Sequence, residues 1–247
     1  MMVSLTHNGS VVSFDVNRAI DISQPVRDGG TPSAFHLPKA HFVPFRVGDF
    51  VGSIEQGGPV RCEVITFAPH GNGTHTECVG HISGKNYLIT DCMQDVLCVA
   101  ELVTVHAELV GTDNVITLSA LLLAWPACTS NTLVLRTVAS NPGYSSGEWS
   151  GTNPPYIAPD AMALIVERGI EHLLIDTPSV DREEDGGALE AHHIFWQWPK
   201  NGRKHCTITE LIAVPPAVTD GIYAIMFNVG SVAADAAPSR PLLFPLS

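Results

Sequence analysis

The sequence predicts an α/β protein with a mixed sheet, and three observations lead to this prediction. Apolar runs typical of buried strands are interspersed with short helical segments along the chain. No internal repeat and no low-complexity linker divides the 247 residues, so one domain over residues 1–247 is expected. An apolar fraction of 45% with only 15% charged residues fits a well-packed protein and not a disordered chain.

The first predicted elements lie between residues 60 and 126. Residues 60–67 alternate enough to form a strand, and residues 96–105 are apolar enough to be a strand buried on both faces. Thr117 or Ser119 caps a short helix, which must end before Pro126.

The second half continues the mixed pattern. Residues 132–138 read as a strand, and residues 139–156 are rich in Ser, Gly, Asn and Pro, which predicts a long loop. Pro159 opens a helix in the first-turn position, where its missing N–H costs nothing, and Gly169 ends that helix. The remaining predicted strands are residues 173–176 and 221–229.

Charge and composition exclude several classes of partner. The formal net charge is −12, which argues against nucleic acid or an anionic membrane surface. The longest apolar run, residues 120–125, is too short to span a membrane. No basic start followed by an apolar core marks a secretory signal, so a cytoplasmic location is expected. No two of the six cysteines form a C-x-x-C pair, and we expect reduced, mostly buried thiols.

The stretch from His70 to His81, with the sequence HGNGTHTECVGH, is the strongest candidate for chemistry. In an extended segment side chains alternate between faces, so His75 and Glu77 point the same way and His81 falls in phase with them. Nitrogen and oxygen donors of this kind suit a divalent ion such as Zn²⁺ or Mn²⁺. Cys78 is a fourth ligand, a nucleophile or, as we favour, a small packed residue. The segment therefore predicts half of a metal site.

This motif and a series of further segments resemble the cyclase family of metal-dependent hydrolases, which includes bacterial kynurenine formamidase and isatin hydrolase. The family pattern H-x-G-T-H-x-D-x-P-x-H is similar to HGNGTHTECVGH in this chain. The other matching segments are Asp21-Ile22-Ser23, Leu135-Arg136-Thr137, Glu167-Arg168-Gly169-Ile170, Ile175-Asp176-Thr177-Pro178-Ser179-Val180-Asp181, Ala191-His192-His193 and Thr209-Glu210-Leu211.

The resemblance implies a swivelling β/β/α-type single domain that assembles as a homo-oligomer, a dimer or a tetramer. It also implies one or two divalent ions, zinc in the formamidases and manganese in isatin hydrolase. The metal ligands carried over by position are His70, His75, Glu77, His81, His192 and Glu210.

This chain departs from the family in four respects, one of which is that the family's proline is replaced within Cys78-Val79-Gly80. His70 is one residue further from His75 than the pattern expects. Glu77 replaces the family's aspartate, and its additional methylene moves the carboxylate by roughly 1 Å or more. Formamidases carry a general acid/base histidine soon after the last ligand of the motif, whereas residues 82–85 contain no histidine.

The activity implied by the resemblance is hydrolysis of a non-peptide C–N amide bond by metal-activated water. An arylformamidase of tryptophan catabolism, acting on an N-formylkynurenine-type substrate, is the first expectation. Hydrolysis of an isatin-like cyclic amide, or a non-catalytic protein that binds metal or a small ligand, are the alternatives. His193 and Glu210 are the candidates for the general acid that protonates the departing nitrogen.

Several further residues have open roles. Asp176 and Asp181 either orient ligand imidazoles or cap turns, with capping slightly favoured. Trp149 and Tyr156 either wall an aromatic pocket or pack the loop down. Residues 143–147 fit G-x-S-x-G, but the residues that follow cannot form the helix that a serine nucleophile elbow requires. We therefore reject a serine hydrolase.

Overall fold

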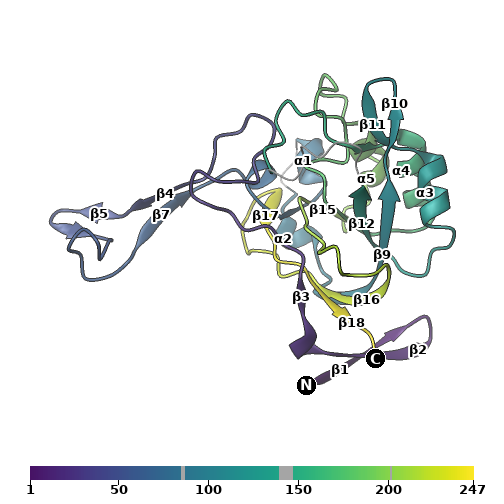
Figure 1. Cartoon of the computed structure of the whole chain (residues 1–247), viewed down its shortest axis with the longest axis horizontal. Helices are drawn as coiled ribbons and strands as arrows, with labels where there is room; N and C mark the ends of the chain where they lie inside the picture. Colours follow the sequence, from purple (N-terminus) through teal and green to yellow (C-terminus); the bar gives the residue numbers. More distant parts are fainter. Residues whose placement is uncertain (85–86, 139–146, 201) are drawn as a thin grey trace.

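The computed structural model describes residues 1–84, 87–138, 147–200 and 202–247. Its centre is a nine-stranded mixed sheet in the order β17-β8-β15-β14-β12-β9-β16-β18-β3 (Figure 1). The strands of this sheet are β3 (Ile20–Asp21), β8 (His75–Glu77), β9 (Leu97–His106), β12 (Thr132–Val138), β14 (His172–Ile175), β15 (Thr207–Glu210), β16 (Gly221–Met226), β17 (Ala236–Pro238) and β18 (Leu242–Pro245).

The middle of the sheet is parallel and both of its sides are antiparallel. Strands β9, β12, β14 and β15 run in the same direction. On one side β8 pairs antiparallel with β15 and with β17, and on the other β16 pairs antiparallel with β9 and with β18. The register of β8 against β15 sets Glu210 opposite His75 and Ile208 opposite Glu77. Residues far apart in the sequence thus share one face of the sheet.

Three helices lie on one side of the sheet (Figure 1). These are α3 (Leu118–Ala124), α4 (Pro159–Glu167) and α5 (Glu190–Trp196). The shorter helical turns are η1 (Val16–Arg18), η2 (Pro69–Gly71), α1 (Gly80–Ser83) and α2 (Ile89–Cys92). No helix within the described ranges has the length and apolar character needed to cross a bilayer.

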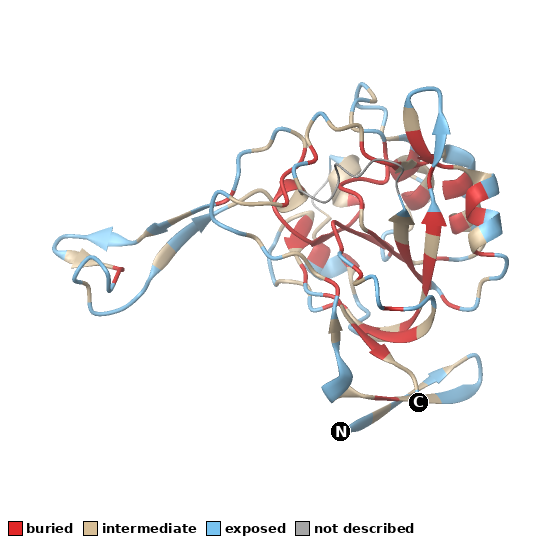
Figure 2. Ribbon diagram, in the orientation of Figure 1, coloured by how far each residue is buried: buried red, intermediate tan, exposed pale blue. Residues whose placement is uncertain are grey.

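The core has one layer on each face of the sheet, because strand side chains alternate. Leu133 and Leu135 of β12 face the helices and pack in one cluster with Phe195 and Ile165. Val134, between them, belongs to a second cluster on the opposite face. Figure 2 shows the buried residues concentrated in the central strands and on the inner sides of the helices.

Most of the predicted elements are confirmed. Residues 96–105 correspond to β9, residues 132–138 to β12 and residues 173–176 to β14. Helix α3 begins after Thr117, whose hydroxyl accepts the N–H of Ala120 at 3.1 Å. Residues 143–146 of the rejected serine motif lie outside the described residues.

The predicted strand over residues 60–67 is present only in part, and it lies outside the central sheet. Strand β7 (Glu63–Thr66) pairs with β4 (His41–Pro44) in an arm that projects from the body (Figure 1). The outer part of the arm holds β5 (Arg46–Val47) paired with β6 (Phe50–Val51).

Two other small sheets lie outside the arm. One joins β1 (Met2–His7) with β2 (Ser10–Asp15), and the other joins β10 (Glu108–Val110) with β11 (Asp113–Ile116) and β13 (Tyr156–Ile157).

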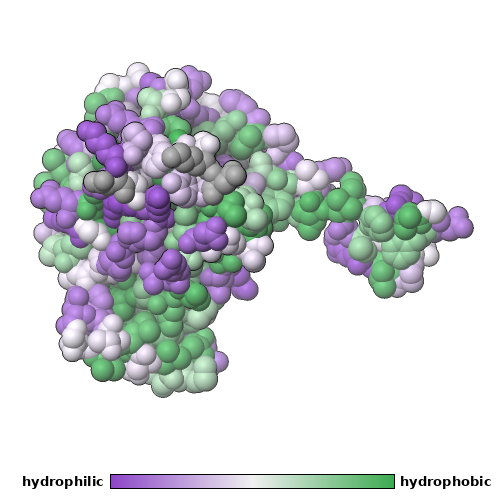
Figure 3. Space-filling view, turned by 180° about the vertical axis from the view of Figure 1, so that it is seen from behind, coloured by the Kyte–Doolittle hydropathy of each residue, from purple (hydrophilic) through white to green (hydrophobic). Residues whose placement is uncertain are grey.

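The arm exposes apolar side chains to an unusual degree. Among the large hydrophobic residues that are exposed, seven lie in it: Val43, Phe45, Val47, Ile54, Val60, Val64 and Ile65. Figure 3 shows apolar side chains along its neck and at its end. A two-stranded ribbon on its own is only marginally stable in water, and a contiguous apolar surface is typical of an interaction site.

We therefore propose that the chain self-associates through this arm. Light scattering after size exclusion should give a multiple of the 26.4 kDa chain mass. Replacing Val47 and Ile54, which are 60% and 62% exposed, by glutamate should shift the protein to monomers. Val11→Glu is the matched control, since Val11 is 73% exposed on the separate β1–β2 hairpin. A wild-type protein that elutes as a monomer would contradict the proposal.

Candidate metal centre

Strand β8 supplies two buried side chains of the centre. His75 and Glu77 both have 0% exposure and point to the same face of the strand. The Nδ1 atom of His75 lies 3.0 Å from the carbonyl oxygen of Gly73. Because a carbonyl only accepts, this contact places the ring proton on Nδ1 and leaves Nε2 free to face the cluster. The predicted pairing of His75 with Glu77 on one face is confirmed.

His70 reaches the same cluster through a tight turn. The additional residue between His70 and His75 is accommodated by the 3₁₀ turn η2, in which both Gly71 and Asn72 donate their N–H to the carbonyl of Ala68 at 3.1 Å. Glycine suits position 71, since a Cβ there would lie 2.9 Å from a Leu37 side-chain carbon and 3.0 Å from the carbonyl oxygen of Ala34, a tight fit. His70 Nδ1 consequently lies 3.1 Å from Glu77 Oε2.

His192 comes from the first turn of α5 and is oriented by Asp181. The Asp181 carboxylate accepts the backbone N–H groups of Ala191 and His192 at 2.7 and 3.1 Å. It also accepts His192 Nδ1 at 2.5 Å, which directs Nε2 toward Glu77 Oε1 at 3.1 Å. Capping and orienting, which the sequence left as alternatives for Asp181, are thus both carried out by one side chain.

Glu210, at the end of β15, completes the cluster. Its Oε2 lies 3.4 Å from His75 Nε2, as the cross-strand register requires. Its Oε1 accepts the N–H of Val180 at 3.1 Å and lies 3.9 Å from His192 Nε2. The side chains of His70, His75, Glu77, His192 and Glu210 therefore converge from η2, β8, α5 and β15.

The unpaired atoms of this cluster fit a divalent ion. Among the described residues, His75 Nε2 and Glu77 Oε2 are buried without a hydrogen-bond partner, although each lies 3.1–3.4 Å from another donor atom of the cluster. Zinc bonds of 2.0–2.1 Å at tetrahedral angles place ligand atoms about 3.3 Å apart. The donor set of nitrogen and carboxylate oxygen is also the one that zinc and manganese accept.

The charges of the cluster shift its pKa values strongly. Burial alone would lower the pKa of His70, but the carboxylates of Asp235 and Glu77 outweigh it and raise that pKa to about 10. Burial would likewise lower the pKa of His192. The carboxylates of Asp181, Glu77 and Glu210 outweigh this effect and raise that pKa to about 10. Burial would raise the pKa of Glu77, yet the surrounding imidazoles hold it well below its usual value. In the absence of a metal, protons on the histidines compensate the buried carboxylate.

His81 lies at the edge of the cluster, beside a cavity of about 400 Å³. Its side chain is 27% exposed, and its Nδ1 lies 3.9 Å from Glu77 Oε2. The cavity is bounded by His70, His81 and His192 on the metal side and by Phe35, Leu37 and Leu189 as apolar walls. His81 is therefore near enough to act as a ligand, but it is the histidine most accessible to a bound molecule.

The residues around the cavity adopt strained backbone conformations. Phe35, Leu189 and Leu211 have φ values of 57°, 45° and 56°, in the left-handed region. Such a conformation costs a bulky residue on the order of 1–3 kcal/mol and is concentrated at functional sites. The strain supports the interpretation of this cavity as the working site of the protein.

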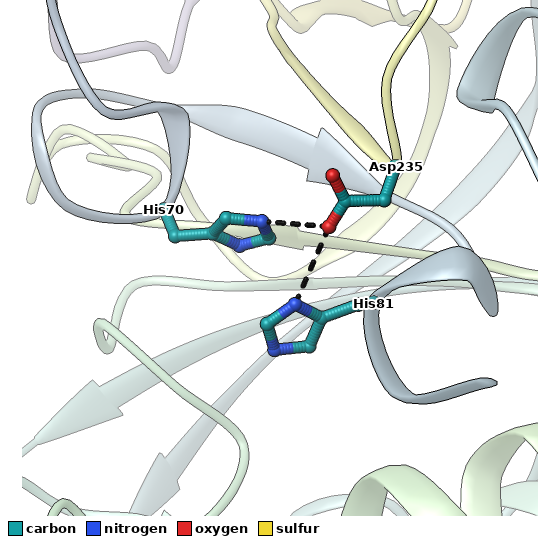
Figure 4. Close-up of side chains that lie close together, drawn as sticks. All are labelled: His70, His81 and Asp235. Carbon is teal, nitrogen blue, oxygen red and sulfur yellow. Dashed lines mark hydrogen bonds and ion pairs between the residues drawn. The ribbon is translucent and has the colours of Figure 1, made fainter. Parts of the chain in front are cut away.

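Asp235 is a residue of the centre that the sequence analysis missed. Its Oδ2 lies 3.0 Å from His70 Nε2 and 3.5 Å from His81 Nδ1 (Figure 4). Hydrogen bonds from the two histidines, opposed by partial burial, lower the pKa of its carboxyl. One signal was available: Asp235 is the only acidic residue between Gly221 and Ser247, in a stretch that is otherwise mostly apolar.

Other predicted site residues lie elsewhere. His193 points away from the cluster, with Nδ1 3.2 Å from the carbonyl oxygen of Trp198, and borders a different cavity. Adjacent residues of a helix face different directions, which separates His193 from His192. Asp176 accepts the N–H and hydroxyl of Thr137 and orients no imidazole of the cluster.

The two predicted aromatic wall residues also lie outside the cavity lining. Trp149 is buried in a cluster with Ala34 and Leu211, against which Phe35 packs. Tyr156 lies in β13, and its hydroxyl donates to Asp113 at 3.3 Å. Trp149 thus packs behind Phe35, which lines the cavity. Of the two roles predicted for Trp149 and Tyr156, both residues have the packing role and neither lines the cavity.

The mixed sheet with a cluster of imidazoles and carboxylates at one edge defines an α/β protein with a site suited to a divalent metal. A comparison with family models identifies the family. The Cyclase family model matches residues 20–182, about two thirds of the chain, and the protein belongs to this family. The match includes the whole of the first motif and Asp181, whereas His192, Glu210 and Asp235 lie beyond it.

Solved structures share the fold at low sequence identity. A protein described as a predicted metal-dependent hydrolase from Bacillus stearothermophilus is 17% identical, with a TM-score of 0.65 over 92% of this chain and 97% of that chain. Isatin hydrolase A from Labrenzia aggregata, bound to benzyl benzoate, is 14% identical, with a TM-score of 0.61 over 92% and 93%. An isatin hydrolase bound to the product analogue thioisatinate is 12% identical, with a TM-score of 0.62 over 93% and 92%.

Metal binding to this centre should release protons. Because the pKa values of His70 and His192 are raised to about 10, both carry an extra proton at pH 7.5 in the metal-free protein, and a ligand nitrogen must lose it. The apparent affinity should therefore increase with pH between about 7 and 10, roughly tenfold per pH unit for each proton released. Calorimetric zinc titrations in two buffers of different ionisation enthalpy count the protons. A pH-independent affinity with no proton release would contradict this assignment.

Proposed function

We propose that this chain is a metal-dependent hydrolase that cleaves a non-peptide C–N amide bond of a small molecule. The observation that carries the proposal is the pair of buried ligand atoms that make no hydrogen bond, His75 Nε2 and Glu77 Oε2, in the cluster beside an open cavity. A purely structural ion would be enclosed by four protein ligands, whereas a catalytic ion keeps one position open toward a cavity. Membership of the Cyclase family, and the solved structure described as a predicted metal-dependent hydrolase that shares the fold, support the assignment.

The buried side chains hold the ion and fix its surroundings. His70, His75 and His192 present one nitrogen each, while Glu77 and Glu210 supply carboxylate oxygens for one or two ions. A bound divalent ion polarises a substrate carbonyl and lowers the pKa of water from about 15.7 toward ~7. Zinc is our first choice and manganese the second, since both accept this mixture of nitrogen and oxygen donors.

The geometry favours His81 as the residue that moves the proton. Its Nδ1 faces Asp235 and Glu77, so its Nε2, on the far side of the ring, is available to the cavity that it lines. General acid/base catalysis requires a group within hydrogen-bond reach of the reacting atoms, and His193 does not line this cavity. Residues 82–85 contain no histidine, but a general acid/base histidine there is not needed, because His81 itself lines the cavity. Glu210, the other candidate, would serve as a ligand.

The cavity suits a compact substrate with an apolar part. A volume of about 400 Å³ accommodates a small molecule, with Phe35, Leu37 and Leu189 against its apolar surface. We propose an arylformamide of the N-formylkynurenine type as the first substrate class. A cyclic amide such as isatin is the second candidate, supported by the isatin hydrolases that share the fold. The solvent-accessible His81 beside the cluster favours an enzyme over a non-catalytic binding protein, because binding alone does not require such a histidine.

Activity on N-formylkynurenine or isatin should be lost with a chelator and restored by zinc or manganese. His81→Gln should lower kcat by about 10²–10⁴-fold, the usual contribution of a general acid/base, while the bound metal content stays at the wild-type level. His193→Gln is the matched control and should keep wild-type kinetics, because its ring lies outside the cavity.

Steady-state kinetics with elemental analysis of each variant separates the roles. Loss of activity in His193→Gln but not in His81→Gln would reverse our assignment of the two histidines. Loss of metal in His81→Gln would make it a ligand. Turnover that persists without any metal would reject the proposed function.

A further inference from the structure

The Asp235 carboxylate lies between two histidines that come from different elements. A single oxygen, Oδ2, is 3.0 Å from Nε2 of His70 in η2 and 3.5 Å from Nδ1 of His81 in α1 (Figure 4). The two imidazole rings are close to one another, with centroids 4.3 Å apart. One carboxylate therefore contacts both a proposed metal ligand and the proposed proton-transfer residue.

The backbone around Asp235 is anchored to the metal strand independently of its side chain. Asp235 accepts the N–H of Cys78 at 3.0 Å, and Ala234 accepts the N–H of Ile89 at 2.8 Å. The next residue, Ala236, pairs with Glu77 in the sheet. Substitution of the carboxylate should therefore leave the chain path unchanged.

Gly80 permits helix α1 to approach this segment. A Cβ at Gly80 would lie 3.0 Å from the Cβ of Asp235 and 2.2 Å from the carbonyl oxygen of Tyr87. The Tyr87 carbonyl is backbone and cannot yield at 2.2 Å, so glycine is required at the start of α1, one residue before His81. The close approach is thus a property of the local backbone as well as of the charged side chains.

The contacts of Asp235 determine which nitrogen each histidine presents. With Nε2 of His70 held by Asp235, its Nδ1 is the atom that faces Glu77 at 3.1 Å. With Nδ1 of His81 facing the same carboxylate, Nε2 is the atom left for the cavity. The arrangement at His70 repeats that of Asp181 and His192, where a carboxylate holds one nitrogen and directs the other to Glu77. Carboxylates that hold a ligand imidazole in this way typically contribute 10–100-fold to metal affinity.

We propose that Asp235 is a positioning residue that sets the tautomers of His70 and His81 together, and so couples the metal centre to the proton-transfer histidine. The proposal rests on the proposed function. It differs from a ligand role for Asp235, because the carboxylate contacts the nitrogen of His70 that faces away from Glu77.

The test compares zinc binding in wild type, Asp235→Asn and Asp95→Asn by competition with a chromophoric chelator. Asp235→Asn should weaken zinc binding by about 10–100-fold with unchanged stoichiometry. Asp95→Asn is the matched control: Asp95 pairs with His172 Nε2 at 3.1 Å, outside the cavity, and its loss should leave zinc affinity unchanged. Wild-type affinity in Asp235→Asn would overturn the proposal, and the loss of one equivalent of zinc would make Asp235 a ligand instead.

A second measurement reports the tautomers without any substrate. In zinc-loaded protein with ¹⁵N-labelled histidine, long-range ¹H–¹⁵N spectra should show the His81 proton on Nδ1 in wild type. Asp235→Ala should release this preference, and Asp95→Asn should not. An unchanged His81 spectrum in Asp235→Ala would overturn the proposal. Failure of wild type to bind zinc would instead reject the proposed function, so the two outcomes are distinguishable.

Discussion

The burial of the Glu77 carboxylate is the constraint on which the rest of the centre depends. A fully buried negative charge is very costly unless it is paired, and removing one partner of a buried ion pair typically costs about 3–5 kcal/mol. Glu77 is 0% exposed and is surrounded by His70, His81 and His192. Either extra protons on these imidazoles or a cation must compensate it. Compensation of the Glu77 charge is therefore a requirement of folding, and a metal ion would compete with protons for the same nitrogens.

The architecture brings the compensating groups to one point at the sheet edge. The antiparallel pairing of β8 with β15 places Glu210 beside His75. Asp181 both caps α5 and holds His192, so the helix cannot shift without moving the ligand. Each ligand histidine has one nitrogen held by an acceptor, and the other nitrogen is thereby directed to the cluster. The selection of a nitrogen by hydrogen bonding is what turns a group of histidines into a defined donor set.

Local sequence patterns predicted the regular elements well and the centre in part. Periodicity and the caps at Thr117 and Pro159 predicted α3 and α4, and alternation along β8 placed His75 with Glu77. Asp235 was missed because its partners are 165 and 154 positions away, and no local pattern encodes such a contact. Alternation predicted the strand at residues 60–67 but not its place in the arm, because alternation reports strand character and not what the strand packs against. The sequence favoured His193 and Glu210 as the proton donor and assigned His81 to the metal, because which histidine lines the cavity depends on how α1 and α5 are oriented around it.

The most direct test of the account is anomalous diffraction from crystals of the protein grown with zinc or manganese. We predict one or two anomalous peaks within bonding distance of Glu77, about 2.0–2.2 Å for zinc, with His75 Nε2, His192 Nε2 and Glu210 among the ligands and His193 without contact. A peak located away from Glu77, or no peak at this cluster despite metal in the crystal, would contradict the claim that the buried carboxylate is the centre of a metal site.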